Sequence, residues 1–398
     1  MLLTAMAAVA ENRIYSPQVK SLQAVVNQDW LSPAVMRLHY NDVLRVGFDE
    51  LSHDYHRYVC HLEHCEADWT VSEDLFESDW LEGFNNIVID DFERSINTTV
   101  PYTHYSMTIP NSQCRLKMSG NYRLSIIDEE QDEVILTVEF LVTEQAMTLS
   151  TAMSSNTDID TNQCHQQVMF GLKYGNLSVT DPQEQLQTVV MQNGREDNWR
   201  WNTKPSAVSQ NGLEWRHCRD LIFDGGNEYR KFEVLDPSHP TMGIDRIVWD
   251  GEYYQAFPFL SEPRPNYLYD EDANGSFYIR NSDNRENDIT SDYVWVNYRL
   301  KSPYPPQGTI VIDGRWTTED PDTYVMEYDT DKQLYTARIL QKQGYYSYQY
   351  LLITDDGRPH PLPSEGNFFE TENHYQILVY YKGTGERTWR LVSYSLLR

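Results

Sequence analysis

The chain has 398 residues, room for two or three domains of roughly 100–200 residues each. Acidic residues number 60 against 32 basic ones, and the formal net charge of −28 argues against nucleic acids and bare anionic lipid as partners. Aromatic residues make up 13% of the chain, which favours β-sheets and argues against disorder.

The N-terminal stretch from Met1 to Ala10 is the longest apolar run of the sequence. It ends in Ala8-Val9-Ala10, a small-x-small pattern typical of a signal-peptidase site, although no basic residues precede it. We interpret residues 1–10 as part of an export signal, with an ordinary apolar N-terminus as the alternative. No run of about 18 apolar residues occurs, so we expect no membrane-spanning helix.

Alternating apolar and polar residues predict strands along the whole chain. In a first β-sandwich, residues 13–145, the clearest are Val43–Leu51, Tyr55–Cys65, Ser106–Ile109, Gly120–Asp128 and Val134–Thr143. In a middle β-sandwich, residues 146–300, they are Gln167–Leu172, Leu186–Met191 and Asp292–Leu300. The polar stretch Thr148–Asp160 reads as a linker or as the first loop of this unit.

A Pro-rich stretch, Lys301–Pro306, predicts the boundary of a third unit at residues 301–398, because proline cannot join a β-ladder. In that unit we expect Gly344–Ile353 and Tyr375–Tyr381 to be strands of one antiparallel sandwich, with the intervening loop projecting from its end. The predicted fold class is therefore all-β, a row of immunoglobulin-like β-sandwich domains.

The motifs of common enzymes are absent from the sequence, which has no P-loop, G-x-S-x-G, H-E-x-x-H or C-x-x-C. His61 and His64, in a stretch rich in possible metal ligands, are three residues apart and would point to opposite faces of a strand. The five cysteines are few and widely spaced, so we interpret them as small buried apolar residues. We therefore expect no catalytic, cofactor-binding or metal-binding residues, and no enzymatic activity.

Part of the third unit is similar to the glycogen-binding, early-set type of immunoglobulin-like domain. The similarity rests on Gly314-Arg315-Trp316, Leu334–Leu340 and Gly344–Tyr350. Such modules stack sugars on exposed Trp and use a Lys beside the aromatic strand. Trp316 matches the first, whereas Gln349 stands where the Lys is usual and Arg358 where a second Trp is usual. The resemblance implies a glycan platform at Trp316 and Gln349.

Longer strings across the chain resemble the type IX secretion system plug protein family of Bacteroidetes. They are His64–Trp69, Asn97–Tyr105, Val189–Arg195, Gly225–Arg230 and Gly366–Asn373. The resemblance covers nearly all of the chain after Arg13. It implies a periplasmic, non-enzymatic protein, without cofactor, that seals the periplasmic mouth of the outer-membrane β-barrel translocon when no cargo is bound.

Recognition on β-sandwiches is commonly carried by loops at their ends. We therefore expect the partner to contact two aromatic and acidic loops, through Asp68, Trp69 and Trp80 in one and Phe368, Phe369 and Glu370 in the other. The alternative for each aromatic residue is that it caps the core of its own sandwich. Two other functions stay open at this point, a glycan-binding protein of the periplasm or cell surface and an unrecognised hydrolase.

Overall fold

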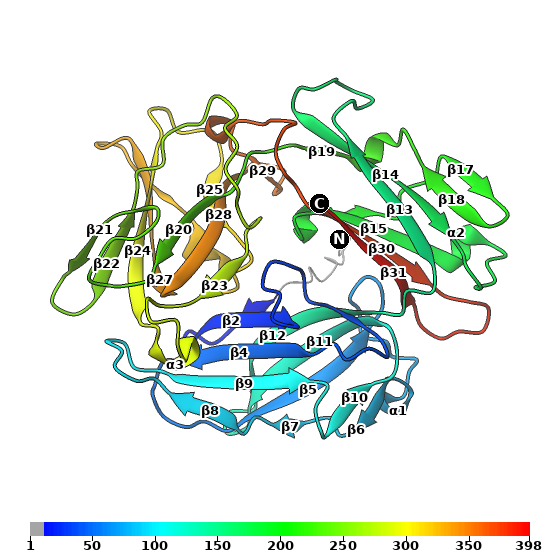
Figure 1. The fold of residues 1–398 in the computed structure, drawn as a ribbon, viewed down its shortest axis with the longest axis horizontal. Coiled ribbons are helices and arrows are strands. Elements are labelled where there is room, and N and C mark those ends of the chain that lie inside the picture. The colour runs from blue at the N-terminus through cyan, green and yellow to red at the C-terminus, as the bar shows by residue number, and fades with distance from the viewer. Residues whose placement is uncertain (1–11) are drawn as a thin grey trace, which may run out of the picture.

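The computed structural model describes residues 12–398, and these residues form three β-sandwich units arranged around a common centre (Figure 1). We call them the first unit, residues 12–144, the second unit, residues 148–224 with 375–398, and the third unit, residues 230–362. The predicted all-β class is confirmed, because helices in the described residues are single turns: α1 (Glu77–Trp80), α2 (Pro182–Gln185), α3 (Asn287–Thr290), η1 (Glu196–Asn198), η2 (Arg219–Leu221), η3 (Pro321–Tyr324) and η4 (Pro363–Glu365).

The proposed export signal at residues 1–10 lies outside the described residues. Within residues 12–398, no helix has the length and apolar character needed to cross a membrane.

The first unit packs a sheet of order β1-β12-β11-β5-β7, with β3 beside β12, against a sheet of order β2-β4-β9-β8. Its strands are β1 (Arg13–Ile14), β2 (Val19–Val26), β3 (Val35–Arg37), β4 (Leu44–Glu50), β5 (Tyr58–Cys65), β6 (Leu81–Gly83), β7 (Ile87–Val88), β8 (Asp91–Arg94), β9 (Thr103–Ile109), β10 (Cys114–Leu116), β11 (Gly120–Asp128) and β12 (Glu133–Thr143). Apolar residues from both sheets form one core, as the alternating patterns of these strands require.

The second unit packs a sheet of order β13-β14-β18-β17, with β19 beside β14, against a sheet of order β16-β15-β30-β31. Its strands are β13 (Thr148–Ser154), β14 (His165–Lys173), β15 (Leu186–Gln192), β16 (Arg200–Trp201), β17 (Ala207–Ser209), β18 (Gly212–Trp215), β19 (Ile222–Asp224), β30 (Tyr375–Tyr381) and β31 (Arg390–Leu397). The stretch Thr148–Asp160, predicted to be a linker or loop, begins with the edge strand β13.

The third unit packs a sheet of order β20-β28-β23, with β25 and β29 beside β28, against a sheet of order β21-β22-β24-β27-β26. Its strands are β20 (Arg230–Val234), β21 (Ile244–Trp249), β22 (Tyr254–Pro258), β23 (Phe277–Ile279), β24 (Tyr293–Lys301), β25 (Thr309–Asp313), β26 (Glu327–Asp329), β27 (Leu334–Lys342), β28 (Gly344–Ile353) and β29 (Pro359–Pro361).

The chain connects the units differently from the sequence-based boundaries. The predicted sandwich partners β28 and β30 lie in different units, since β30 pairs with β15 from Leu186↔Tyr381 to Gln192↔Tyr375. The third unit is thus inserted into the second, and the predicted boundaries at 146–300 and 301–398 are wrong. The Pro-rich stretch Lys301–Pro306 starts at the last residue of β24 and leads to β25 within the third unit. Alternation of apolar and polar residues identifies a strand but not the strand that pairs with it. β30 is buried at every residue, so it needs a neighbouring strand on each edge.

Candidate partner-binding surface and the junctions between units

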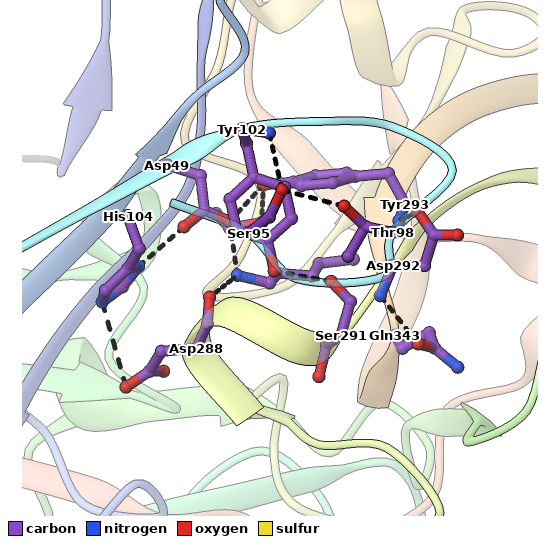
Figure 2. A network of polar contacts seen from close by, with 12 residues as sticks. Asp49, Ser95, Thr98, Tyr102, His104, Asp288, Ser291, Asp292, Tyr293 and Gln343 are labelled. Carbon is purple, nitrogen blue, oxygen red and sulfur yellow. Dashed lines mark hydrogen bonds and ion pairs between the residues drawn. The ribbon is translucent and has the colours of Figure 1, made fainter. Parts of the chain in front are cut away.

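A buried polar network joins the first unit to the third (Figure 2). Asp49 of β4 lies at its centre. Its Oδ2 accepts hydrogen bonds from Lys342 Nζ, at the end of β27, and from the Tyr293 hydroxyl of β24, each at 2.6 Å. Its Oδ1 accepts from Nδ1 of His104 on β9 at 2.7 Å. Lys342 Nζ also donates to the Asp288 carbonyl at 2.6 Å. Three donors therefore converge on one carboxylate at the junction.

This network holds the two units together and is closed to substrates. The side chains of Asp49 and Lys342 are each 1% exposed. Burial alone would raise the pKa of Asp49, but Lys342 and His104 outweigh it and hold the pKa below its usual range. The positive end of Lys342 also lies 4.1 Å from the centre of the Tyr102 ring. In an open cleft, acid and base side chains such as Asp49, His104 and Lys342 would suggest catalysis. Here they connect the first unit to the third.

The string Asn97–Tyr105 supplies the other half of the same junction. The carboxylate of Asp292 accepts hydrogen bonds from the Thr99 and Val100 amides at 2.8 and 3.1 Å, and the Tyr102 hydroxyl donates to the Ser291 carbonyl at 2.7 Å. Gln343 Oε1 accepts a hydrogen bond from the Asp292 amide at 2.7 Å (Figure 2). The loop before β9 is thus fixed by the third unit.

The junction between the first and second units buries the predicted partner residue Trp69. Trp69 is 7% exposed and packs in an apolar cluster with Leu141 of the first unit and Val189 and Leu378 of the second. Its φ of 65° lies in the left-handed region, and the tight turn Glu66–Thr70 directs the indole toward the second unit. The prediction that Trp69 contacts an outside partner is therefore wrong.

Polar contacts surround that cluster. The Tyr380 hydroxyl donates to Asn121 Oδ1 at 2.8 Å, and Glu66 accepts from the Thr388 hydroxyl at 2.8 Å and from the Trp389 amide at 3.1 Å. The string His64–Trp69 is consequently a junction segment, like Asn97–Tyr105.

The second residue predicted in this loop region, Trp80, belongs to the core of the first unit. It is 7% exposed and lies near His64 and Tyr122. The indole cannot reach a partner without unfolding, so this prediction is also wrong. Asp68 is exposed and accepts hydrogen bonds from the Thr70 amide and hydroxyl, and its role in partner binding stays a prediction.

The loop with Phe368, Phe369 and Glu370 bridges the second and third units. The amides of Phe368 and Phe369 donate to the carbonyls of Gly226 and Gln163 at 2.8 and 3.2 Å, and both rings are half-buried. A Cβ on Gly225 would lie 2.0 Å from the Phe368 carbonyl oxygen, so only glycine allows this close approach. Glu370 is exposed, and it and the two half-buried rings stay candidates for a partner surface.

The predicted glycan platform is absent. Trp316 is 7% exposed, donates from Nε1 to the Ser347 carbonyl at 3.0 Å, and packs against Tyr298 and Tyr346. The amide of Gln349 donates to the Tyr229 hydroxyl and to Asp313, each at 2.7 Å. A ring buried in this way has no free face on which a sugar could stack, so Trp316 and Gln349 are structural residues.

A cavity of about 480 Å³ lies where the three units meet. Its lining includes Leu22 and Trp30 of the first unit, Met191 and Gln376 of the second, and Ile312 and Gly314 of the third. Two of its arginines are held by neighbouring groups: Arg195 donates to Asp197 at 3.0 Å, and Arg315 donates to the Leu31 carbonyl at 3.0 Å. Burial raises the pKa of Asp313 despite the nearby Arg195. The cavity is thus part of the junctions.

Sequence reasoning missed a second exposed loop, between β22 and β23. Within it Phe259, Leu268 and Tyr269 are 61%, 80% and 55% exposed. This loop touches the Phe368 loop, since the Tyr267 hydroxyl donates to the Glu370 carbonyl at 3.2 Å. No periodic pattern marks these apolar residues as exposed, and only the fold brings the two loops together.

Three comparisons relate the chain to known proteins. Residues 19–144 match the family model described as type 9 secretion system plug protein 1st domain, and this range coincides closely with the first unit. The crystal structure of a hypothetical protein from Parabacteroides merdae is similar at 35% identity, with a TM-score of 0.94 over 98% of this chain and 99% of that one.

Dimeric latent PorU from Porphyromonas gingivalis aligns at 10% identity over 96% of this chain and 34% of that one, with a TM-score of 0.16, too low for any inference. Curated proteins give no match. Residues 19–144, which make up most of the first unit, therefore belong to the type 9 secretion system plug protein family as its first domain.

Proposed function

We propose that this protein closes the periplasmic opening of the outer-membrane β-barrel translocon of the type 9 secretion system when no cargo is bound. Family membership carries the proposal. It gives the chain a role in type 9 secretion, a partner in that system, and a periplasmic or outer-membrane-associated location in Bacteroidetes. Closing this particular opening is the step that we add.

The build of the three units supports such a role. A plug must resist deformation, and here each unit is fixed to the others by buried contacts: the Asp49–Lys342 pair, the cluster around Trp69, and the loop at Phe368. Insertion of the third unit into the second adds two chain crossings between them, so these units cannot separate by bending a single linker. The molecule therefore offers a broad, stiff body.

We also propose that the protein acts by binding and not by catalysis. The acid and base cluster at Asp49, His104 and Lys342 is buried and used between units. A panel of glycan, ester and peptide substrates should give no turnover above that of a heat-inactivated sample. Turnover that follows the purified protein through successive columns would contradict this.

For the contact surface we propose two adjoining loops: the loop between β22 and β23 of the third unit, and the loop with Phe368 that bridges the second and third units. They expose Leu268, Tyr269 and Glu370 beside Phe368. Large apolar side chains on a loop are suited to the centre of a moderate interface, and acidic neighbours to its polar rim. Such an interface can form and still release, as a plug requires.

The test is a pull-down of tagged protein from gently solubilised native envelopes, with mass spectrometry of the bound proteins. We expect a very large outer-membrane barrel in near-equal amount. Leu268→Asp combined with Tyr269→Ser should reduce that recovery, whereas Val208→Asp, at an equally exposed apolar residue of the second unit, should not. Absence of a membrane partner in several detergents would overturn the plugging function. An unchanged recovery with the double variant would exclude these loops only.

A further inference from the structure

A cluster of three possible metal ligands lies in the second unit, at the end of the loop between β13 and β14. The atoms concerned are Asp160 Oδ2, Cys164 Sγ and His165 Nδ1, which all lie within 4.8 Å of one another. His165 Nδ1 is 2.7 Å from Asp160 Oδ2 and 3.3 Å from Cys164 Sγ, and Sγ is 3.5 Å from Oδ2. The three side chains are partly buried, with 9% of Asp160 and 26% of His165 exposed.

These distances are close to those of a tetrahedral zinc site. Zn–S bonds of about 2.3 Å and Zn–N and Zn–O bonds of about 2.0–2.2 Å place the donors roughly 3.3–3.6 Å apart. The two distances to Cys164 Sγ already fall in this range. The third, between His165 and Asp160, is shorter because a proton bridges the two atoms. Replacing that proton by a metal ion requires the pair to open by less than about 1 Å.

The groups around the cluster are placed as outer ligands of a metal site usually are. The other ring nitrogen, His165 Nε2, lies 3.5 Å from Asp224 Oδ1, a carboxylate that can fix the ring orientation. Asp224 is in turn held by Asn367 Nδ2 at 2.8 Å, and Asp160 Oδ1 accepts from the Thr157 hydroxyl at 2.8 Å. A metal ion here would therefore be connected to the loop that bridges the second and third units.

We propose that Asp160, Cys164 and His165 bind one divalent metal ion of the zinc class, with a fourth position open to water. Thiolate and imidazole donors select zinc over magnesium and calcium, which prefer oxygen alone. On binding, the Cys164 thiol releases its proton to solvent, and the His165 proton moves from Nδ1 to Nε2, facing Asp224. The ion would stiffen the loop at Asn367.

His61 and His64, in the stretch that is rich in possible metal ligands, do not form a comparable cluster. His61 Nδ1 lies 2.8 Å from Asn86 Oδ1, and His64 Nδ1 lies 2.9 Å from the Ser72 hydroxyl, on opposite sides of β5. A second adjacent pair of the same residue types, His217 and Cys218, also fails to converge on one point. His217 turns to Asp158 at 3.0 Å, whereas Cys218 Sγ contacts backbone carbonyls. That pair is a matched control.

The experiment is titration of the purified full chain with Zn²⁺ by calorimetry and with Co²⁺ by absorption spectroscopy. We expect one ion per chain and, with Co²⁺, a thiolate-to-metal charge-transfer band. Cys164→Ser should abolish the band, and Asp224→Asn should weaken Zn²⁺ binding by roughly 10–100-fold. The double variant His217→Gln/Cys218→Ser should behave as the unmodified protein.

Stoichiometric Co²⁺ binding without the charge-transfer band would overturn the proposal, as would the absence of any binding. So would a band that survives in Cys164→Ser or is lost in the control variant. Because the spectrum of the unmodified protein already decides whether a thiolate is a ligand, the test does not depend on the variants folding. Far-ultraviolet circular dichroism of each variant separates loss of the ligand from loss of the fold.

Discussion

Breaking the buried pair of Asp49 and Lys342 should measure how strongly the first and third units are joined. Removing one member of a buried ion pair typically costs about 3–5 kcal/mol, because the other charge is left uncompensated. The two single substitutions differ in the hydrogen-bond partners that remain for the charge left behind. In Lys342→Met, Asp49 keeps the donors Tyr293 and His104 at 2.6 and 2.7 Å. We therefore expect a loss near 3 kcal/mol.

In Asp49→Asn, Lys342 keeps the Asp288 carbonyl, the Tyr102 and Tyr293 rings and the attraction of the Asp288 carboxylate. It loses the carboxylate that it contacts directly, so we expect this change to cost more, about 4–5 kcal/mol. The double variant Asp49→Asn/Lys342→Met removes both charges of this pair. It should be more stable than the sum of the single effects implies, by about 1–3 kcal/mol.

The assay is equilibrium unfolding in urea followed by intrinsic fluorescence, with m-values compared to detect loss of two-state behaviour. Lys301→Met is the matched control, because Lys301 pairs with Glu262 on the surface and both are about half-exposed. That change should cost less than about 1 kcal/mol. Single effects at Asp49 and Lys342 that add within about 0.5 kcal/mol in the double variant would refute the reasoning.

Three further changes test other parts of the structure. Burial and nearby arginines lower the pKa of His374 to about 4, so the folded state resists protonation of this side chain. The free energy of unfolding should therefore fall as pH drops from about 6.5 to about 4. His374→Gln should flatten the dependence of the urea midpoint on pH, and an unchanged dependence would exclude His374 as its source. Trp316→Ala should cost about 3–5 kcal/mol in urea without altering retention on polysaccharide resin, and a selective loss of retention in the folded variant would restore the glycan platform. Gly225→Ala places a Cβ 2.0 Å from the Phe368 carbonyl oxygen, so hydrogen exchange should increase in residues 366–373, and normal protection there would mean that the loop moves aside at little cost.

The strands could be predicted from sequence because their side chains alternate against a core. Gly120–Asp128 agrees with β11, and Gly344–Ile353 with β28. Partners of these strands could not be predicted, because alternation carries no information on which edge meets which. The strand Tyr375–Tyr381 lies only 22 residues after β28, yet it pairs with β15 far back in the chain. A domain boundary drawn from the order of strands alone fails when one unit is inserted into another.

The candidate site illustrates a second limit, since residue type does not determine exposure. Trp69, Trp80 and Trp316 occur in stretches rich in polar residues, where an aromatic ring suggests a contact surface, yet each is 7% exposed. Lys342 is the opposite case. It stands in Gln341-Lys342-Gln343, which reads as a solvated turn between two strands, and it is 1% exposed because the first unit covers that turn. Contacts between units bury Trp69 and Lys342, whereas Trp80 and Trp316 are buried in the cores of their own units. In both cases the contacts are not local in sequence.

Several of the segments that resemble the plug protein family are therefore segments that hold the units together. Asn97–Tyr105 binds Asp292 across one junction, and Gly225–Arg230 and Gly366–Asn373 meet across another. A surface that binds a partner can change together with that partner, whereas a junction must satisfy buried polar groups on both of its sides at once. Recognition of the family by these strings thus reports the rigid arrangement of the units. The partner surface has to be found from exposure, which is why the loop at Leu268 is the more informative place to change first.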